Sequence, residues 1–231
     1  MAVTIEEGRA TYAPPAAQLA VATRKYAVEF IGTFFLAFAV GMAALSGSAF
    51  TPLAAGATLM VMVYAGGHIS GGHYNPAVTI AALVRGRIGI RDAVGYWVVQ
   101  AGAGVVAGAL ARALVNPATV KTLTLTGHTE AAAAVAELLI TFALCYVVLN
   151  VATSKDQPNN GFFGLAIGFT VAAGAFAVGG LSGGVFNPAV ALGGATAGLF
   201  AWSTIWVYLL VELGAGVAAG LAFRALNPGD K

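Results

Sequence analysis

A nine-residue motif occurs twice in this chain, as Ser-Gly-Gly-His-Tyr-Asn-Pro-Ala-Val over residues 70–78 and as Ser-Gly-Gly-Val-Phe-Asn-Pro-Ala-Val over residues 182–190. Asparagine before proline and an apolar run predicts a helix start, because the Asn side chain caps free N–H groups and proline suits the first helical position. Both helices should be short, since Arg85 follows the first and Gly193-Gly194 interrupt the second. The residues that open them are Asn75, Pro76, Ala77, Asn187, Pro188 and Ala189. Paired half-helices of this kind indicate a pore or a binding site.

Few other residues could take part in chemistry or ligand binding. Glu29, Glu137 and Glu212 stand within apolar runs, where a carboxylate is a candidate functional group. His68 and His73 are close in sequence, but no cysteine or carboxylate joins them, so we expect no metal site. We find no nucleophile–base pair, and we expect neither an enzyme nor a bound cofactor.

The composition places these residues in a membrane. Of 231 residues, 59% are hydrophobic and only 9% are charged, and apolar stretches long enough to cross a bilayer recur along the chain. The net charge of +2 does not indicate a nucleic-acid partner, and the single Cys145 excludes an internal disulfide. Residues 1–23 lack the apolar core of a cleavable signal peptide, so we expect a cytoplasmic tail.

The apolar stretches predict six transmembrane helices. The uncharged run from Leu53 to Val84 is too long for one crossing, and its Gly66-Gly67 and Gly71-Gly72 pairs should divide it into a helix, a loop and a half-helix from Pro76 to Leu83. The expected spans are Tyr26 to about Leu45, Thr51 to about Tyr64, Asp92 (as the cap) to about Leu114, Ala131 to about Val151, Phe162 to about Val178 and Trp202 to about Leu226.

The glycines before each Asn-Pro pair permit irregular backbone. At membrane depth such backbone is tolerated only where it lines a cavity or is buried in protein. We therefore interpret the loop carbonyls as hydrogen-bond acceptors for a passing solute, with a filler role as the alternative. The residues concerned are Gly71, Gly72, His73, Gly183, Gly184 and Val185.

The repeat extends beyond the motif, since Gly102-Ala-Gly-Val and Arg112-Ala-Leu recur 112 residues later. Repeats over residues 24–116 and 131–228, within one membrane domain of residues 24–231, each contain three crossings and a half-helix. Because three is odd, the second repeat must be inverted. With the N-terminus inside, nine basic residues face the cytoplasm and only Arg112 and Lys121 lie outside. We expect a multi-pass protein of the cell membrane with both termini cytoplasmic.

These motifs resemble the major intrinsic protein family, the aquaporins and glycerol facilitators. Residues 67–79 are similar to its first loop and residues 186–189 to its second, and the likeness extends over roughly residues 25–227. The resemblance implies an all-α membrane fold of six transmembrane helices and two re-entrant half-helices in an inverted repeat. It also implies half-helices that meet at their N-termini, a homotetramer with one pore per subunit, and passive conduction. In the family, glutamates at the positions of Glu29 and Glu137 support the glycine-rich loops.

The chain departs from the family's pattern at the selectivity filter. Arginine usually follows the second Asn-Pro-Ala, but here the residue is Val190, and Ala191 replaces the aspartate of the glycerol branch. Counted by the same pattern, the other filter positions fall at Ala55, Ala175 and Gly184, so all four are small or apolar.

We therefore predict a passive channel in the lipid bilayer for water and small uncharged solutes. Two facing helix N-termini, each with a partial positive charge, should exclude cations and protons. The alternative is a wider facilitator for glycerol, urea, ammonia, hydrogen peroxide or metalloid acids, which the small filter residues favour over strict water selectivity. A coupled transporter also uses inverted repeats, but neither half-helix supplies the ionisable residues it would need.

Overall fold

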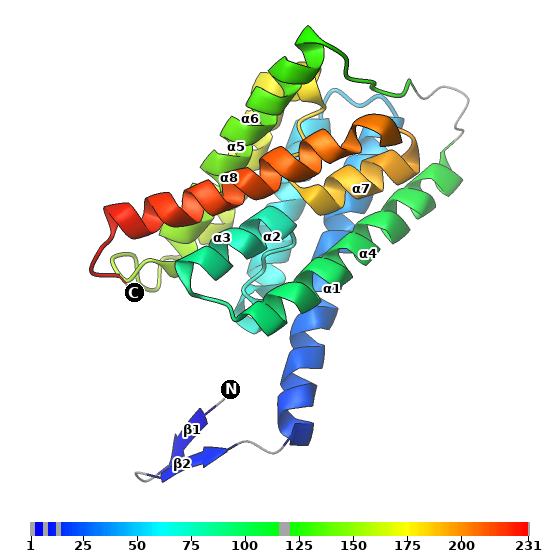
Figure 1. Ribbon diagram of the computed structural model, residues 1–231. Helices are drawn as coiled ribbons and strands as arrows, with labels where there is room; N and C mark the ends of the chain where they lie inside the picture. Colours follow the sequence, from blue (N-terminus) through cyan, green and yellow to red (C-terminus); the bar gives the residue numbers. More distant parts are fainter. Residues whose placement is uncertain (1–2, 7–8, 13–14, 116–120, 231) are drawn as a thin grey trace.

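The computed structural model describes residues 3–6, 9–12, 15–115 and 121–230. Six of its helices are long and apolar enough to cross a membrane, and two shorter apolar helices accompany them (Figure 1), as the sequence predicted. The elements are β1 (Val3–Glu6), β2 (Arg9–Tyr12), α1 (Pro15–Leu45), α2 (Thr51–Ser70), α3 (Pro76–Arg85), α4 (Ile90–Leu114), α5 (His128–Thr153), α6 (Phe163–Ser182), α7 (Pro188–Ala197), the 3-10 helix η2 (Trp202–Thr204) and α8 (Ile205–Leu226). The strands β1 and β2 form a small antiparallel hairpin ahead of the helices.

The two halves of the chain are interleaved. Helix α1 packs on α2 and α4, α5 packs on α6 and α8, and α2 contacts α6 across the molecule. Each half-helix packs chiefly on the last helix of the opposite half, α3 on α8 and α7 on α4 (Figure 1). Neither half therefore encloses its own half-helix.

Glycines allow these close approaches. A Cβ at Gly104 of α4 would overlap the carbonyl of Ala189, and one at Gly216 of α8 would overlap the carbonyl of Ala77. Both residues of each contact recur at the same offset, so the contact is made twice, once in each half. Backbone-to-backbone packing of this kind relies on small residues in membrane helices.

Two predicted helix breaks are wrong, and close packing explains both. Helix α7 continues through Gly193-Gly194. Gly193 serves close packing instead, since a Cβ there would come within 2.7 Å of the Gly104 carbonyl oxygen. Helix α2 likewise continues through Gly66-Gly67. The missing side chain of Gly66 leaves space for the Tyr74 hydroxyl. The chain leaves α2 at Gly71, where φ is +92°.

The N-terminal boundaries of two helices also differ from expectation. Helix α1 begins at Pro15, so part of the segment expected as a tail is helical. Helix α4 begins at Ile90 with Gly89 as its N-cap, and Asp92 lies in its first turn. The Asp92 carboxylate accepts a hydrogen bond from Lys25 Nζ at 3.2 Å instead of capping the helix.

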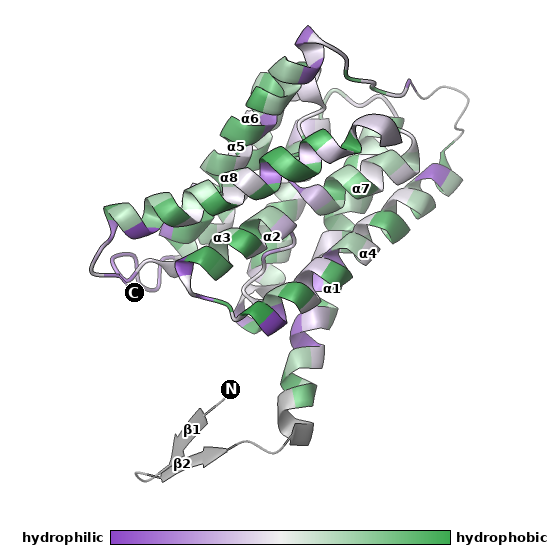
Figure 2. Cartoon of the chain, in the orientation of Figure 1, coloured by the Kyte–Doolittle hydropathy of each residue, from purple (hydrophilic) through white to green (hydrophobic). Residues whose placement is uncertain are grey.

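The outer surface suits a lipid environment. Hydrophobic residues cover most of the long helices, whereas hydrophilic residues gather mainly at helix ends and in loops (Figure 2). Large apolar side chains that the fold leaves exposed include Val98 of α4, Leu139 of α5 and Phe176 of α6. Such a band is what a bilayer core requires.

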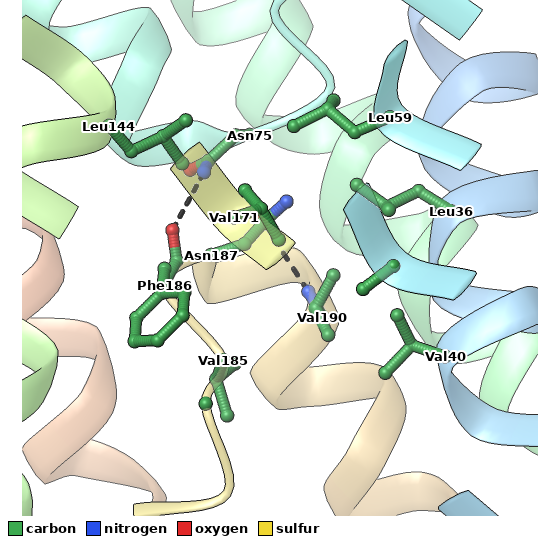
Figure 3. Close-up of a pocket in the computed structure, with 12 residues that line it drawn as sticks. Leu36, Val40, Leu59, Asn75, Leu144, Val171, Val185, Phe186, Asn187 and Val190 are labelled. Carbon is green, nitrogen blue, oxygen red and sulfur yellow. Dashed lines mark hydrogen bonds between the residues drawn. The ribbon is translucent and has the colours of Figure 1, made fainter. Parts of the chain in front are cut away.

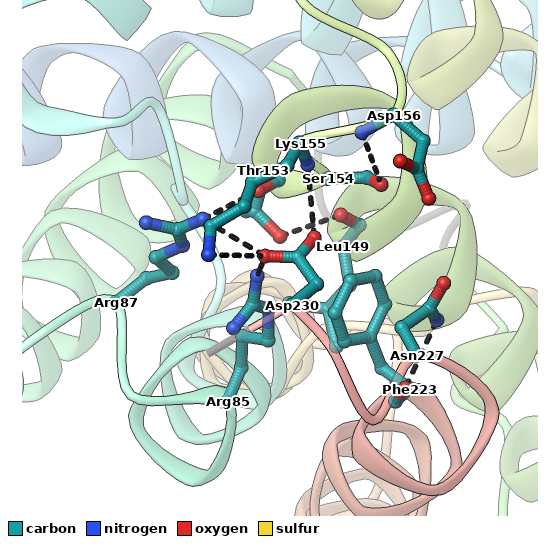
Figure 4. A network of polar contacts seen from close by, with 10 residues as sticks. All are labelled: Arg85, Arg87, Leu149, Thr153, Ser154, Lys155, Asp156, Phe223, Asn227 and Asp230. Atoms are coloured by element: carbon teal, nitrogen blue, oxygen red, sulfur yellow. Dashed lines mark hydrogen bonds and ion pairs between the residues drawn. The ribbon is translucent and has the colours of Figure 1, made fainter.

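A buried ion pair ties the C-terminal segment to α3. Asp230 is only 6% exposed and accepts a hydrogen bond from Arg85 Nη2 at 2.6 Å, and Arg87 and Lys155 converge on the same carboxylate (Figure 4). The backbone N–H of Lys155, 2.9 Å away, and the Arg85 guanidinium hold the pKa of Asp230 below its ordinary value. The guanidinium of Arg85 also lies over the ring of Phe223. One carboxylate thus connects α3, the α5–α6 loop and the segment after α8.

Candidate functional site

The two glycine-rich loops have almost the same backbone conformation. Gly71 and Gly183 have φ of 92° and 91°, and the next glycine in each loop is also in the left-handed region. Tyr74 and Phe186 have positive φ as well, at 48° and 52°. A non-glycine residue in this region costs roughly 1–3 kcal/mol and persists only where its surroundings fix it. Both loops therefore hold a strained backbone in front of the half-helices.

Each half-helix is capped by its own asparagine and joined to the opposite loop by it. Asn75 Oδ1 accepts from the Ala77 N–H at 2.8 Å, and Asn187 Oδ1 accepts from the Ala189 N–H at 2.9 Å. The amides then cross over. Asn75 Nδ2 donates to the Phe186 carbonyl at 2.8 Å (Figure 3), and Asn187 Nδ2 donates to the Tyr74 carbonyl at 2.9 Å. One hydrogen of each amide is used in this way, which leaves the other for a solute.

The meeting point of the half-helices is electropositive. Each helix N-terminus carries a partial charge of about +0.5 from its unpaired N–H groups. The reciprocal asparagine bonds bring the starts of α3 and α7 together, so these partial charges act on the same small volume. The arrangement repels cations and offers N–H donors to oxygen atoms.

A buried glutamate lies behind each loop. Glu29 Oε1 accepts from Ser70 Oγ at 2.7 Å and from the His73 N–H at 2.9 Å, and Oε2 accepts from the Tyr74 N–H at 2.7 Å. Both Glu29 and its counterpart Glu137 are 0% exposed.

Glu137 repeats this pattern in the second half. It accepts from Ser182 Oγ at 2.6 Å and from the N–H groups of Val185 and Phe186 at 3.0 and 2.7 Å. The donors on each side include the residue with positive φ, so these contacts hold the strained loop backbone.

Two further pairs support the loops, and the motifs alone did not reveal them. Tyr96 and Tyr208 each donate their hydroxyl to the carbonyl of a serine, Ser70 or Ser182, at 2.6 Å. The serine hydroxyls in turn accept N–H groups of the glycine loops at 3.1 and 3.2 Å. The two tyrosines are 112 residues apart, and so are the two serines, so the repeat offset is the sequence feature that could have indicated these supports.

The predicted acceptor carbonyls have no partner among the described residues. No N–H or O–H of residues 15–115 and 121–230 donates to the carbonyls of Gly71, Gly72, His73, Gly183, Gly184 or Val185. The His73 ring is engaged elsewhere, with Nδ1 3.1 Å from Thr79 Oγ1. Unpaired carbonyls in an irregular loop are suited to hydrogen bonding with a solute or water.

A cavity adjoins the two asparagines (Figure 3). Of the predicted filter residues, Ala55, Gly184 and Val190 line it. Ala175 is not among its lining residues and lies against Gly184, whereas Val171, one turn earlier on α6, lines the cavity. The remaining lining residues are Leu36, Val40, Leu59, Asn75, Leu144, Val185, Phe186 and Asn187. Among these described residues none is charged, and the only polar side chains are the two asparagines.

Within the described part of the chain, no group of three His, Cys, Asp or Glu side chains is close enough to hold a metal ion. The site therefore consists of backbone dipoles, two amides and an apolar wall. Its chemistry is the hydrogen bonding and exclusion of solutes.

Comparison with known proteins identifies the family. The model of the family described as major intrinsic protein matches residues 16–223. The chain belongs to the major intrinsic protein family. Members of this family are passive channels, so the chain is a passive transmembrane channel for water and small solutes and not an enzyme.

Individual relatives agree with this membership. A "Glycerol uptake facilitator protein-like 6" of Lactiplantibacillus plantarum is 42% identical over 207 residues, which is 85% of this chain and 95% of the relative. "Aquaporin NIP1-4" of Oryza sativa is 39% identical over 206 residues, 83% of this chain and 72% of the relative. The X-ray structure of the aquaglyceroporin from Plasmodium falciparum matches with a TM-score of 0.75 at 19% identity, covering 90% of this chain and 98% of the other. That structure shows the same fold.

Proposed function

We propose that this major intrinsic protein is a facilitator with little water selectivity, which conducts small uncharged solutes such as glycerol or urea together with water. The supporting observation is the wall of the cavity, where Val190 takes the place of the family's arginine and lies near Ala55 and Gly184. These side chains add neither charge nor a hydrogen-bond donor, and two of them add almost no bulk. One relative carries the name of a glycerol facilitator and others that of aquaporins, which is consistent with both solutes.

The second part of the proposal is that cations and protons are excluded at Asn75 and Asn187. A cation there meets two helix N-termini, and it finds amide hydrogens rather than oxygens. A neutral solute can donate to the loop carbonyls and accept from the asparagines in turn. Exclusion by helix ends does not require the missing arginine.

The experiment is stopped-flow light scattering on proteoliposomes, with the ratio of glycerol or urea permeability to water permeability as the readout. Val190→Arg introduces bulk, charge and N–H donors into the wall of the cavity and should lower this ratio. Val190→Met, a matched control, adds bulk without charge and should lower it less. An unchanged ratio in a correctly folded Val190→Arg channel would show that the constriction lies elsewhere.

We further propose a homotetramer in the cell membrane, with both termini cytoplasmic and one channel domain over residues 24–231. In a Cys145→Ala background, a cysteine at Lys155 should react only with a reagent on the cytoplasmic side, and a cysteine at Lys121 only with one outside. Labelling of both from one side would refute the inverted topology. Mass determination in native nanodiscs tests the tetramer, and a monomer there would refute it.

A further inference from the structure

The supports behind the two loops differ at one position. In the first half, Gln100 Nε2 donates to Glu29 Oε2 at 2.9 Å and contacts Thr79 Oγ1 at 3.1 Å. The residue 112 positions later is Glu212, on α8, and the counterpart of Thr79 is Ala191. An amide that donates to the first glutamate is thus replaced by a carboxyl group beside the second.

Glu212 has no positively charged partner in the part of the chain that the structure describes. Its side chain is 0% exposed and lies beside the carboxyl group of Glu137; no side-chain donor of the described residues reaches its oxygens, and the backbone N–H of Asn187 is the donor that faces them. Glu137 itself already accepts three donors, from Ser182, Val185 and Phe186. These donors stabilise Glu137 as the carboxylate and leave Glu212 with a negative neighbour.

Among the described residues no cationic side chain lies beside this pair, and the N-terminus of α7 at Asn187 supplies only a partial positive charge. Helix α5 contributes Glu137 and Cys145, α6 contributes Ser182, and α8 contributes Tyr208 and Glu212. The ion pairs of the described residues all involve Asp92 or Asp230, so none reaches Glu137 or Glu212. Two adjacent buried carboxylates without a cation are strongly unfavourable, because burial and mutual repulsion both oppose the second charge.

We propose that Glu212 is a protonated positioning residue, whose carboxylic acid O–H donates to the Glu137 carboxylate as the Gln100 amide donates to Glu29. The pair binds one proton from solvent, and no other bond forms or breaks. Through Glu137 this proton holds the second loop, which carries Gly184 and Val185 at the cavity. This role of Glu212 does not depend on which neutral molecule passes through the channel.

The proton makes the second loop sensitive to alkaline pH. An unfolded glutamate is ionised at neutral pH, whereas the folded pair retains a proton, so the folded state binds more protons and stability must fall as pH rises. The contribution is complete in acid and is lost as pH rises through the range in which the pair releases its proton. For one proton, the unfolding equilibrium constant rises by up to about tenfold per pH unit between the ordinary pKa of a glutamate and the pH at which the folded pair releases its proton.

Infrared spectroscopy of the reconstituted channel tests the proposal directly. The parent protein at neutral pH should show the C=O stretch of a protonated carboxylic acid, resolved from carboxylate bands and shifted in D2O. Glu212→Gln should remove this band, and the control Glu130→Gln, in the first turn of α5, should keep it. Gln100→Glu, which copies the second arrangement into the first half, should add a second band.

A pH profile provides the functional readout. As pH is raised above neutral, the melting temperature and solute permeability of the parent should fall, and those of Glu212→Gln should change less, because the Gln amide donates without titrating. If Glu212→Gln does not fold, the infrared spectrum of Glu212→Asp tests the proposal instead, since this variant should keep a carboxylic acid band at a shifted frequency. The proposal is overturned if the parent has no acid band, or if the band is unchanged in the folded Glu212 variants.

Discussion

Asn187→Asp isolates the electrostatic role of the meeting half-helices. Aspartate has nearly the same shape as asparagine and still caps α7 by accepting from the Ala189 N–H. It cannot donate to the Tyr74 carbonyl, 2.9 Å away, and it adds a negative charge where α3 and α7 begin. The change therefore keeps the cap and cancels the positive field of the two helix ends.

The size of the effect follows from the charges involved. Two helix N-termini supply about +1 in total, so one carboxylate cancels them. At a distance of about 5 Å and an effective dielectric constant of about 20, a unit charge is worth about 3 kcal/mol to a passing cation. That energy corresponds to a cation occupancy at the pore centre roughly a hundredfold higher. Loss of the donor to Tyr74 should also reduce stability by about 1–3 kcal/mol.

The assay is potassium and proton flux into proteoliposomes, followed with fluorescent indicators, beside water flux from light scattering. Cation flux should rise in Asn187→Asp and in its repeat mate Asn75→Asp, more so at alkaline pH, where the carboxylate is fully ionised. Gln157→Glu, which adds the same charge in an exposed loop, should leave cation flux unchanged. If both pore variants fold, conduct water and still exclude cations at alkaline pH, the helix ends are not the cation barrier.

Three further predictions concern stability, measured as thermal unfolding in detergent. Gly104→Ala should destabilise by about 1–3 kcal/mol, since its Cβ would overlap the Ala189 carbonyl, whereas Gly102→Ala has open space and should not; equal effects would contradict the packing argument. Glu29→Ala should cost several kcal/mol because it leaves buried N–H groups of the first loop unpaired, and a change within about 0.5 kcal/mol would contradict its supporting role. Asp230→Asn should lower the melting temperature at pH 7. Because the pKa of Asp230 is lowered in the folded protein, the difference in melting temperature between variant and parent should shrink as pH falls below about 4. A difference that stays constant with pH would exclude the ion pair as its cause.

The repeated motif made the overall fold predictable. Asn-Pro specifies a helix start through local chemistry, and a second copy at a fixed offset predicts the same structure twice, so the half-helices and six spans followed from the sequence. Helix ends were less predictable, because a glycine pair can break a helix or permit close packing. Which role applies to Gly66 depends on Tyr74 and Val28, whose approach is a tertiary contact.

The candidate site was predictable where a motif or the family resemblance indicates its residues, and less so where contacts between distant segments decide. Glu29 and Glu137 could be named from the resemblance, but Tyr96 and Tyr208 reach serine carbonyls 26 positions earlier in the chain, a contact that no local pattern indicates. Ala175 was placed by counting and stays a predicted filter residue; it lies against Gly184, and Val171 lines the cavity one turn earlier on α6.

The crossed asparagine bonds also set an order of events during biosynthesis. The Asn75 amide and the Phe186 carbonyl are 111 residues apart, so at about 5–20 residues per second the ribosome needs roughly 5–20 s to supply the second after the first. Throughout that interval the first re-entrant loop has its strained Tyr74 but not the contact that joins it to α7. A loop in this condition cannot remain in lipid, because its backbone groups would be unpaired. Closure of the first half therefore awaits synthesis of the second, and a defect in the second motif should expose the first loop to quality-control proteases.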